Sequence, residues 1–230
     1  MRVSIKICLA LTIAVGVAAA TLGGYAFFIT RQAQSLLKDI TALRVGSSSE
    51  ADVERLAKVH GRYLTSKEDE GNGFRIRFTV WNTWLSTLRL EPPAWFGAAV
   101  SVRRGRVYHI GAWLMRSMDI FPTFQASAGA VDEYAEYPAY LSNMRRTDYG
   151  FPTPIGKPYL RVLLDAHASP LQRAHAFDFS FRCLVKPGGG CDLPCDYLPS
   201  AWQDWKAESR TGGDLDLFNR VYPKNSRCGP

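Results

Sequence analysis

A run of 23 residues without a charged side chain, Ile7 to Ile29, constrains this chain more than any other feature of its sequence. At about 1.5 Å per helical residue the run is roughly 34 Å long, enough to cross a hydrocarbon core of about 30 Å. Arg2 and Lys6 precede the run, and Arg31 follows it. The sequence therefore predicts a short stub and a transmembrane anchor over residues 1–30, with the rest of the chain beside a bilayer.

A cleaved secretory signal is the alternative interpretation of this segment. The basic start is followed by the small residues Ala18 and Ala20, which a signal peptidase accepts. The apolar run continues past Ala20 to Ile29, however, whereas a cleaved signal has a shorter apolar core. We therefore expect an uncleaved anchor, and secretion after cleavage near Ala20 remains the alternative.

The charges near the ends of the run predict its orientation. Arg2, Lys6 and the terminal amine outweigh Arg31 and the more distant Lys38, which favours a cytoplasmic N-terminus. The distal part of the chain holds an even set of cysteines, as expected where disulfides form: Cys183, Cys191, Cys195 and Cys228. Both observations predict a single-pass protein of the bacterial inner membrane with an extracytoplasmic C-terminal domain.

Four cysteines permit three disulfide pairings. We expect Cys183 to pair with Cys191, because the glycines at 188–190 allow a sharp fold between them, and Cys195 to pair with Cys228. A zinc site is the alternative, but the spacing lacks the two-residue separation typical of zinc ligands. We therefore expect disulfides and no metal.

Composition and charge narrow the class of protein. About 200 residues follow the anchor, enough for one globular domain or two small ones. The whole chain has 47% hydrophobic and 12% aromatic residues, which is typical of globular proteins. The net charge is +7, and +5 without Arg2 and Lys6, but no run of Lys or Arg exceeds two residues. This favours a solvated basic surface, and no motif for nucleic acid is present.

Residues 31–44 carry leucines and isoleucine at spacings of three and four, which predicts an amphipathic helix continuing from the membrane. A second helix is expected shortly after it. Ser47 with Glu50, or Ser49 with Asp52, offers a capping box for its start. Its apolar stripe comprises Val53, Leu56, Ala57 and His60.

Gly61 is expected to end the second helix by adopting the left-handed conformation. The polar segment Lys67–Gly73 predicts a turn or loop. Apolar and polar residues then alternate over Phe74–Val80 and on both sides of Arg104-Gly105, which predicts a three-stranded antiparallel meander. Residues 31–116 are thus predicted to form a helix–helix–β-meander module.

Residues 117–230 are predicted to form a loop-rich β extension with the disulfides. Residues 117–157 show no sustained period, so mostly loop is expected, with a short helix around Val131–Ala135. Further on, alternation of apolar and polar residues predicts strands at Tyr159–Ala166 and Phe177–Cys183. Capping residues predict helices at Ser169–His175 and from Pro199.

The sequence Leu-Arg-Val-Gly-Ser-Ser-Ser-Glu-Ala-Asp-Val-Glu-Arg-Leu at residues 43–56, followed by the predicted meander, resembles the SmpA/OmlA (BamE-like) lipoproteins. A similar Val-Gly-Ser/Met motif lies between the two helices of their helix–helix–sheet module. The resemblance covers about residues 31–116. It implies that module's fold and, by fold-level analogy, a role in assembling outer-membrane proteins.

Candidate catalytic groups are scattered. The four histidines His60, His109, His167 and His175 lack metalloprotease spacing. Asp165 with His167 could orient a base for Ser169 or Ser180, but the strand–turn–helix elbow of a nucleophilic serine is not evident around either serine. We therefore expect no catalytic residues and no cofactor.

Tryptophans are the more informative class, since Trp81, Trp84, Trp95 and Trp113 gather in the predicted sheet. They are candidates for a stacking platform that binds sugars or peptides, and filling of the core is the favoured alternative.

Together these patterns predict an α+β protein with an N-terminal transmembrane helix, two short helices, an antiparallel sheet and a disulfide-bearing C-terminal extension. The expected partners are the lipid bilayer and another envelope protein, and nucleic acid is not expected. An interaction or structural module of the bacterial envelope is the favoured function. An envelope hydrolase and a cell-wall ligand-binding protein are the alternatives.

Overall fold

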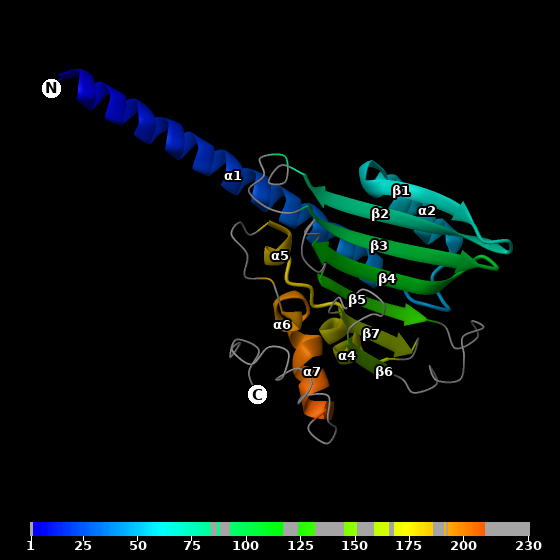
Figure 1. Cartoon of the computed structure of the whole chain (residues 1–230). Coiled ribbons are helices and arrows are strands. Elements are labelled where there is room, and N and C mark those ends of the chain that lie inside the picture. The colour runs from blue at the N-terminus through cyan, green and yellow to red at the C-terminus, as the bar shows by residue number, and fades with distance from the viewer. Residues whose placement is uncertain are drawn as a thin grey trace.

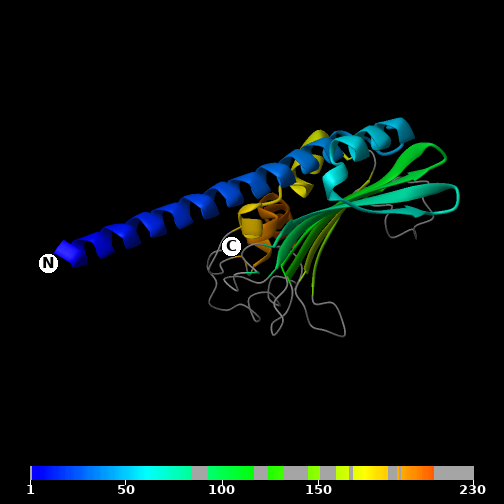
Figure 2. The same cartoon turned by 90° about the horizontal axis from the view of Figure 1, so that it is seen from above.

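The computed structural model describes residues 2–83, 87, 93–116, 124–131, 145–150, 159–165, 168–185, 191 and 193–209. These residues form a seven-stranded sheet with helices packed on one side (Figure 1). Figure 2, seen from above, shows that the long N-terminal helix runs along that side and projects far beyond the sheet. The chain therefore belongs to the α+β class that its sequence predicts.

Helix α1 (Arg2–Ala42) is a single helix whose two halves have different surroundings. In the first half the large apolar side chains are exposed, by 56–68% between Ile7 and Val17. In the second half a stripe at spacings of three and four is buried: Ile29, Ala33, Leu36, Leu37 and Ile40. By length and composition the apolar half is able to cross a membrane, and the amphipathic half continues it without interruption, as predicted.

Local hydrogen bonds define the turn after α1 and the start of the next helix. Gly46 has a φ of 79°, a conformation that glycine adopts without steric cost, and its N–H donates to Val107 O at 2.7 Å. Helix α2 (Glu50–Val59) starts with the second of the two predicted capping boxes. The Ser49 hydroxyl accepts from the Asp52 N–H, and the Asp52 carboxylate accepts from the Ser49 N–H.

The prediction for Gly61 is wrong. Helix α2 ends at His60, which has a φ of −105°, and Gly61 opens the 3-10 helix η1 (Gly61–Tyr63) without entering the left-handed region. The His60 ring lies 2.8 Å from a carboxylate oxygen of Asp39 on α1. This tertiary contact holds the end of α2, so the glycine does not have to reverse the chain.

The seven strands form one sheet in the order β1-β2-β3-β4-β5-β7-β6. Every neighbouring pair is antiparallel except β5 and β7, which run parallel. The strands are β1 Leu64–Asp69, β2 Gly73–Asn82, β3 Ala94–Arg103, β4 Arg106–Arg116, β5 Phe124–Val131, β6 Arg145–Gly150 and β7 Tyr159–Asp165. The β3–β4 turn lies at Arg104 and Gly105, as predicted, and both residues have positive φ, which suits a two-residue hairpin.

The predicted antiparallel sheet is confirmed in part, and three details of it differ from the prediction. Residues 67–69 belong to β1, so the meander has four strands, and β5 and β6 occupy residues that were expected to be loop. The parallel β5–β7 pair also means that the sheet is not wholly antiparallel. Strand β5 lies between β4 and β7, so backbone pairing on both sides fixes a strand that side-chain alternation does not reveal. Of the short helix expected at 131–135, Val131 ends β5 and the other residues lie outside the described part.

The core fills the space between the sheet and the helices. Phe78, Phe96 and Leu114 are fully buried on the side that faces α1, together with Leu36 and Ile40 from the helix itself. Because side chains alternate along a strand, the neighbouring residues of β2, β3 and β4 point to the opposite face. The sheet therefore has a core face covered by helices and an outer face.

The strand predicted at Phe177–Cys183 is also wrong. Phe177 ends helix α4, and Cys183 lies in the short helix α5. The rings of Phe179 and Phe181 meet the Phe96 ring edge-on, with centroids 5.8 and 5.0 Å away. The alternation arises because this connecting segment directs every second side chain into the core, and it joins no sheet edge.

Four helices make up the described C-terminal part: α4 Pro170–Ala176, α5 Arg182–Val185, α6 Pro194–Tyr197 and α7 Pro199–Ser209. The predicted start of α4 is confirmed, because Ser169 caps the helix immediately before Pro170 and forms a capping box with Gln172. The predicted helix from Pro199 is also confirmed, and it buries Trp202. Cys183 is joined to Cys191, as expected, with 5.5 Å between their Cα atoms.

Replacing Leu36 by alanine tests the contact between α1 and the sheet. Leu36 is fully buried, so Leu36→Ala should lower the free energy of unfolding by about 2–5 kcal/mol. Urea unfolding of the full chain in detergent, followed by tryptophan fluorescence, measures this loss. Leu171 is 65% exposed, and Leu171→Ala is the control with an expected change below about 0.5 kcal/mol. Equal unfolding midpoints for the two variants would contradict the packing.

Candidate functional site

Three of the four candidate tryptophans lie together on the outer face of the sheet. Trp81 and Trp95 are register partners on β2 and β3, and their ring centroids are 4.9 Å apart at an interplanar angle of 32°. Trp113 on β4 is the partner of Gly97, and a Cβ atom at Gly97 would collide with the Trp113 indole. The indole therefore lies directly over the glycine backbone. Trp84 lies outside the described residues.

These tryptophans do not belong to the core between sheet and helices. Trp81 is 46% exposed, and Trp95 and Trp113 are half-buried. They sit at the end of the sheet where Asn82 donates a hydrogen bond to Leu184 O of α5 at 2.6 Å. Helix α5 contacts α1, so this is the end of the sheet from which the exposed half of α1 emerges (Figure 1).

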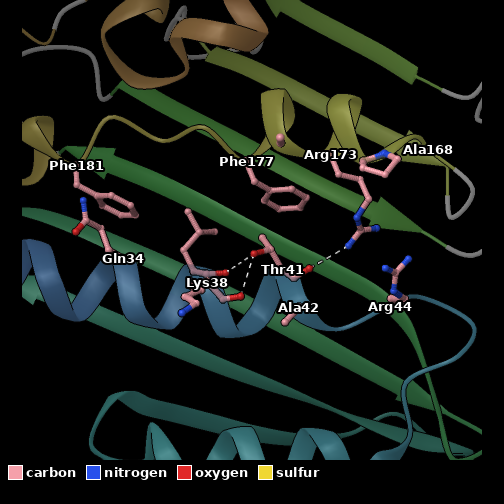
Figure 3. A pocket seen from close by; sticks show the side chains of 12 residues that line it. Gln34, Lys38, Thr41, Ala42, Arg44, Ala168, Arg173, Phe177 and Phe181 are labelled. Carbon is pink, nitrogen blue, oxygen red and sulfur yellow. Dashed lines mark hydrogen bonds between the residues drawn. The ribbon is translucent and has the colours of Figure 1, made fainter.

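A groove of about 510 Å³ lies on the helical side of the molecule. Helix α1 forms one wall, and α4 with the segment that follows it forms the other (Figure 3). Leu37, Phe177 and Phe181 supply apolar surface to these walls. The volume falls within the range of about 300–1,000 Å³ that is usual for small-molecule sites.

All charged residues in the described lining of the groove are basic. Lys38, Arg44 and Arg173 line it, and no aspartate or glutamate is among the described lining residues. None of the three cations forms an ion pair with a carboxylate in the described part of the chain. Burial lowers the pKa of the Arg173 guanidinium, and the neighbouring charge of Arg44 lowers it further. Along its described lining the groove is therefore electropositive.

Arg173 also has a structural role. Its guanidinium donates to Thr41 O at 3.4 Å and to Leu43 O at 3.2 Å, at the C-terminal end of α1. Carbonyl groups at the end of a helix have no partner within the helix and carry partial negative charge. Arg173 therefore caps α1 and joins it to α4 across the groove (Figure 3).

Two of the scattered histidines, His60 and His175, have separate carboxylate partners. His60 meets Asp39, and Nδ1 of His175 lies 3.0 Å from a carboxylate oxygen of Asp204. His167 lies outside the described residues, and Ser169, its proposed neighbour, serves as the cap of α4. Within the described ranges no three residues of His, Cys, Asp or Glu are placed to hold a metal ion.

The remaining predicted disulfide is partly described. Cys195 is disulfide-bonded, and its predicted partner Cys228 lies outside the described residues. Cys8, in the apolar half of α1, is a free thiol.

Sequence reasoning did not find the groove. Lys38 and Arg44 are visible as basic residues of the first amphipathic helix, but Arg173 is about 130 positions away in sequence. The one available signal is that the segment Arg31–Arg44 has more basic than acidic residues. Nothing in a linear pattern places α4 beside that segment.

No protein-family model, curated protein or solved structure shows a significant match to this chain. The resemblance of residues 31–116 to the SmpA/OmlA lipoproteins therefore stays a prediction from the sequence.

The two arginines of the groove predict different effects on stability. Arg173→Gln removes the cap of α1 and should lower the free energy of unfolding by about 1 kcal/mol. Arg44→Gln removes an exposed side chain that bonds no carbonyl, so its change should stay below about 0.5 kcal/mol. Urea unfolding of both variants measures the difference. A larger loss for Arg44→Gln would contradict the capping role.

Proposed function

We propose that this chain is a single-pass, signal-anchored protein of the bacterial inner membrane whose disulfide-bearing domain lies outside the cytoplasm and binds another envelope component. The observation that carries the proposal is the continuity of α1. Its exposed apolar half leads directly into the part of the helix that packs on the domain, where Tyr25 is partly buried against the core and Ile29 is the first buried residue.

This continuity supports an uncleaved anchor. Cleavage near Ala20 would divide one helix and leave the apolar side chains of Phe27 and Phe28, which are 63% and 41% exposed, at the start of a soluble protein. In an anchored protein the same side chains lie at the membrane interface. There Arg31 lies over the Phe27 ring and Arg62 over the Phe28 ring, at 5.2 and 5.4 Å, an arrangement suited to the headgroup region.

The Cys183–Cys191 disulfide supports an extracytoplasmic domain, because disulfides persist in oxidising compartments and are rare in the cytosol. Binding is favoured by the two surfaces that the described residues offer. One is the cationic groove and the other is the outer aromatic face, and cations and exposed rings are groups that recognise ligands.

Thiol labelling tests the topology. In a Cys8→Ala background, Ser47→Cys places a thiol in the exposed turn after α1, and Ser4→Cys places one in the N-terminal stub. An impermeant maleimide should label Ser47→Cys in intact spheroplasts and Ser4→Cys only after lysis. The opposite pattern would reverse the proposed orientation.

Intact mass separates anchor from signal in the same samples. Retention of the full N-terminus is expected. A mature protein that begins near residue 21 and is recovered from the soluble fraction would overturn the anchored form of the proposal.

Cell-wall ligand binding is a second candidate, favoured by the exposed Trp81–Trp95 pair. Soluble peptidoglycan fragments should then change the tryptophan fluorescence of the full chain in detergent. Trp81→Ala should weaken that binding roughly tenfold, the loss expected for one ring stacked on a ligand. Leu171→Ala removes an exposed apolar side chain on α4 and serves as the control. An unchanged affinity for Trp81→Ala would exclude the platform.

A further inference from the structure

The groove begins close to the membrane end of the domain. Gln34 lies five residues after Ile29, which is about 8 Å along the helix, and Ala42, the last residue of α1, lies thirteen residues after Ile29, about 20 Å. Arg44 follows in the turn after α1. The groove thus runs along α1, roughly parallel to the direction in which the apolar half of the helix leaves the domain. Its two ends therefore lie at different heights above the proposed bilayer surface.

The two ends also differ in chemistry. Figure 3 shows Gln34 beside Phe181 at one end, and Arg44 beside Arg173 at the other. Leu37 and Phe177 line the groove between them. The end nearer the membrane is neutral and largely apolar, and the end farther from it is doubly cationic. About 12 Å of α1 separates Gln34 from Ala42, and Arg44 follows in the turn after the helix, a span that suits a medium-length alkyl chain.

The positive charges at the cationic end have no counter-charge among the described lining residues. Arg44 and Arg173 are near enough for their charges to interact, yet no described carboxylate lies within ion-pair distance of either one. The two carbonyls that Arg173 bonds carry only partial charge, and its guanidinium has five N–H donors. An anion between the arginines would relieve the repulsion, and a phosphate with a charge near −2 matches two or three cations better than a single carboxylate.

We propose that this groove binds a single-chain phosphate monoester, with its phosphate between Arg44 and Arg173 and its alkyl chain along Leu37, Phe177 and Phe181 toward the membrane. Lys38 lies at the exposed rim and adds a third positive charge. The direction of the chain rests on the proposed membrane anchoring, whereas the class of ligand rests on the groove alone. The ligand thus belongs to the lipid-derived phosphates, and a free or sugar-linked phosphate would use only the cationic end.

Calorimetric titration of the full chain in phosphatidylcholine nanodiscs tests the proposal. The three probes are decyl phosphate below its micelle concentration, inorganic phosphate, and decyl maltoside, which has the same chain and a neutral head. After subtraction of empty nanodiscs, decyl phosphate should bind saturably with one site per chain. The other two probes should bind at least tenfold more weakly. Equal affinity for inorganic phosphate would overturn the role of the alkyl chain, and equal affinity for decyl maltoside would overturn the role of the charge.

Variants locate the site. Arg44→Gln should weaken decyl phosphate binding at least tenfold, and its exposed position leaves the fold intact. Ala174 is an exposed residue of the groove wall, and Ala174→Trp should block the groove by bulk without altering charge. Lys58→Gln removes one exposed positive charge from α2, away from the groove, and should leave the affinity unchanged. Loss of affinity in Lys58→Gln equal to that in Arg44→Gln would show a general charge effect and refute the site.

The proposed function and this site fail separately. If thiol labelling shows the opposite topology while decyl phosphate still binds, the proposed class of ligand is retained. Only the proposed direction of its alkyl chain toward a bilayer is then refuted. If the topology holds and neither Arg44→Gln nor Ala174→Trp alters the affinity, the groove is not the site.

Discussion

Burial of one stripe of α1 against the sheet positions nearly everything else in this molecule. Ile29 to Ile40 supply the side chains that cover the core face, and the same helix continues, unbroken, into the exposed apolar segment. A continuous helix transmits orientation as well as position. The domain is therefore fixed relative to the direction of the apolar segment, with α5 and the Trp81 end of the sheet nearest to it. No described linker separates the two parts.

The groove follows from the same helix. Helix α4 lies beside the C-terminal part of α1 because Arg173 caps the carbonyls there, and the phenylalanines after α4 insert into the core alongside Phe96. This arrangement places Lys38 and Arg44 opposite Arg173, and none of the lining residues that the structure describes is a carboxylate. On the far side of the sheet, Gly97 makes room for the Trp113 indole next to the Trp81–Trp95 pair. The two candidate surfaces are thus separated by the thickness of the sheet and its core.

Local patterns predicted the elements that local forces decide. The helix cap at Ser169, one of the two capping boxes offered for α2, the hairpin turn at Arg104-Gly105 and the continuous amphipathic half of α1 appear where the sequence places them. The failures share a cause. Strand β5 is defined by its neighbours, and the alternating phenylalanines lie in a connecting segment, so both depend on contacts between distant parts of the chain. The sequence identified the tryptophans as candidates, but it did not predict which rings would lie side by side. That depends on the register of β2 with β3, which pairs Trp81 with Trp95.

The sequence by itself predicted the apolar helix, the α+β class, the starts of α4 and α7 and the Cys183–Cys191 disulfide, because each depends on neighbouring residues and short-range geometry. Only the tertiary structure decided that the sheet has seven strands with one parallel pair, and that Arg173 faces Arg44 across a groove. The physical reason is that long-range pairing depends on which surfaces remain unburied after local structure forms. The sequence pattern shows which face of each helix or strand is apolar, but it does not show which other element that face packs against.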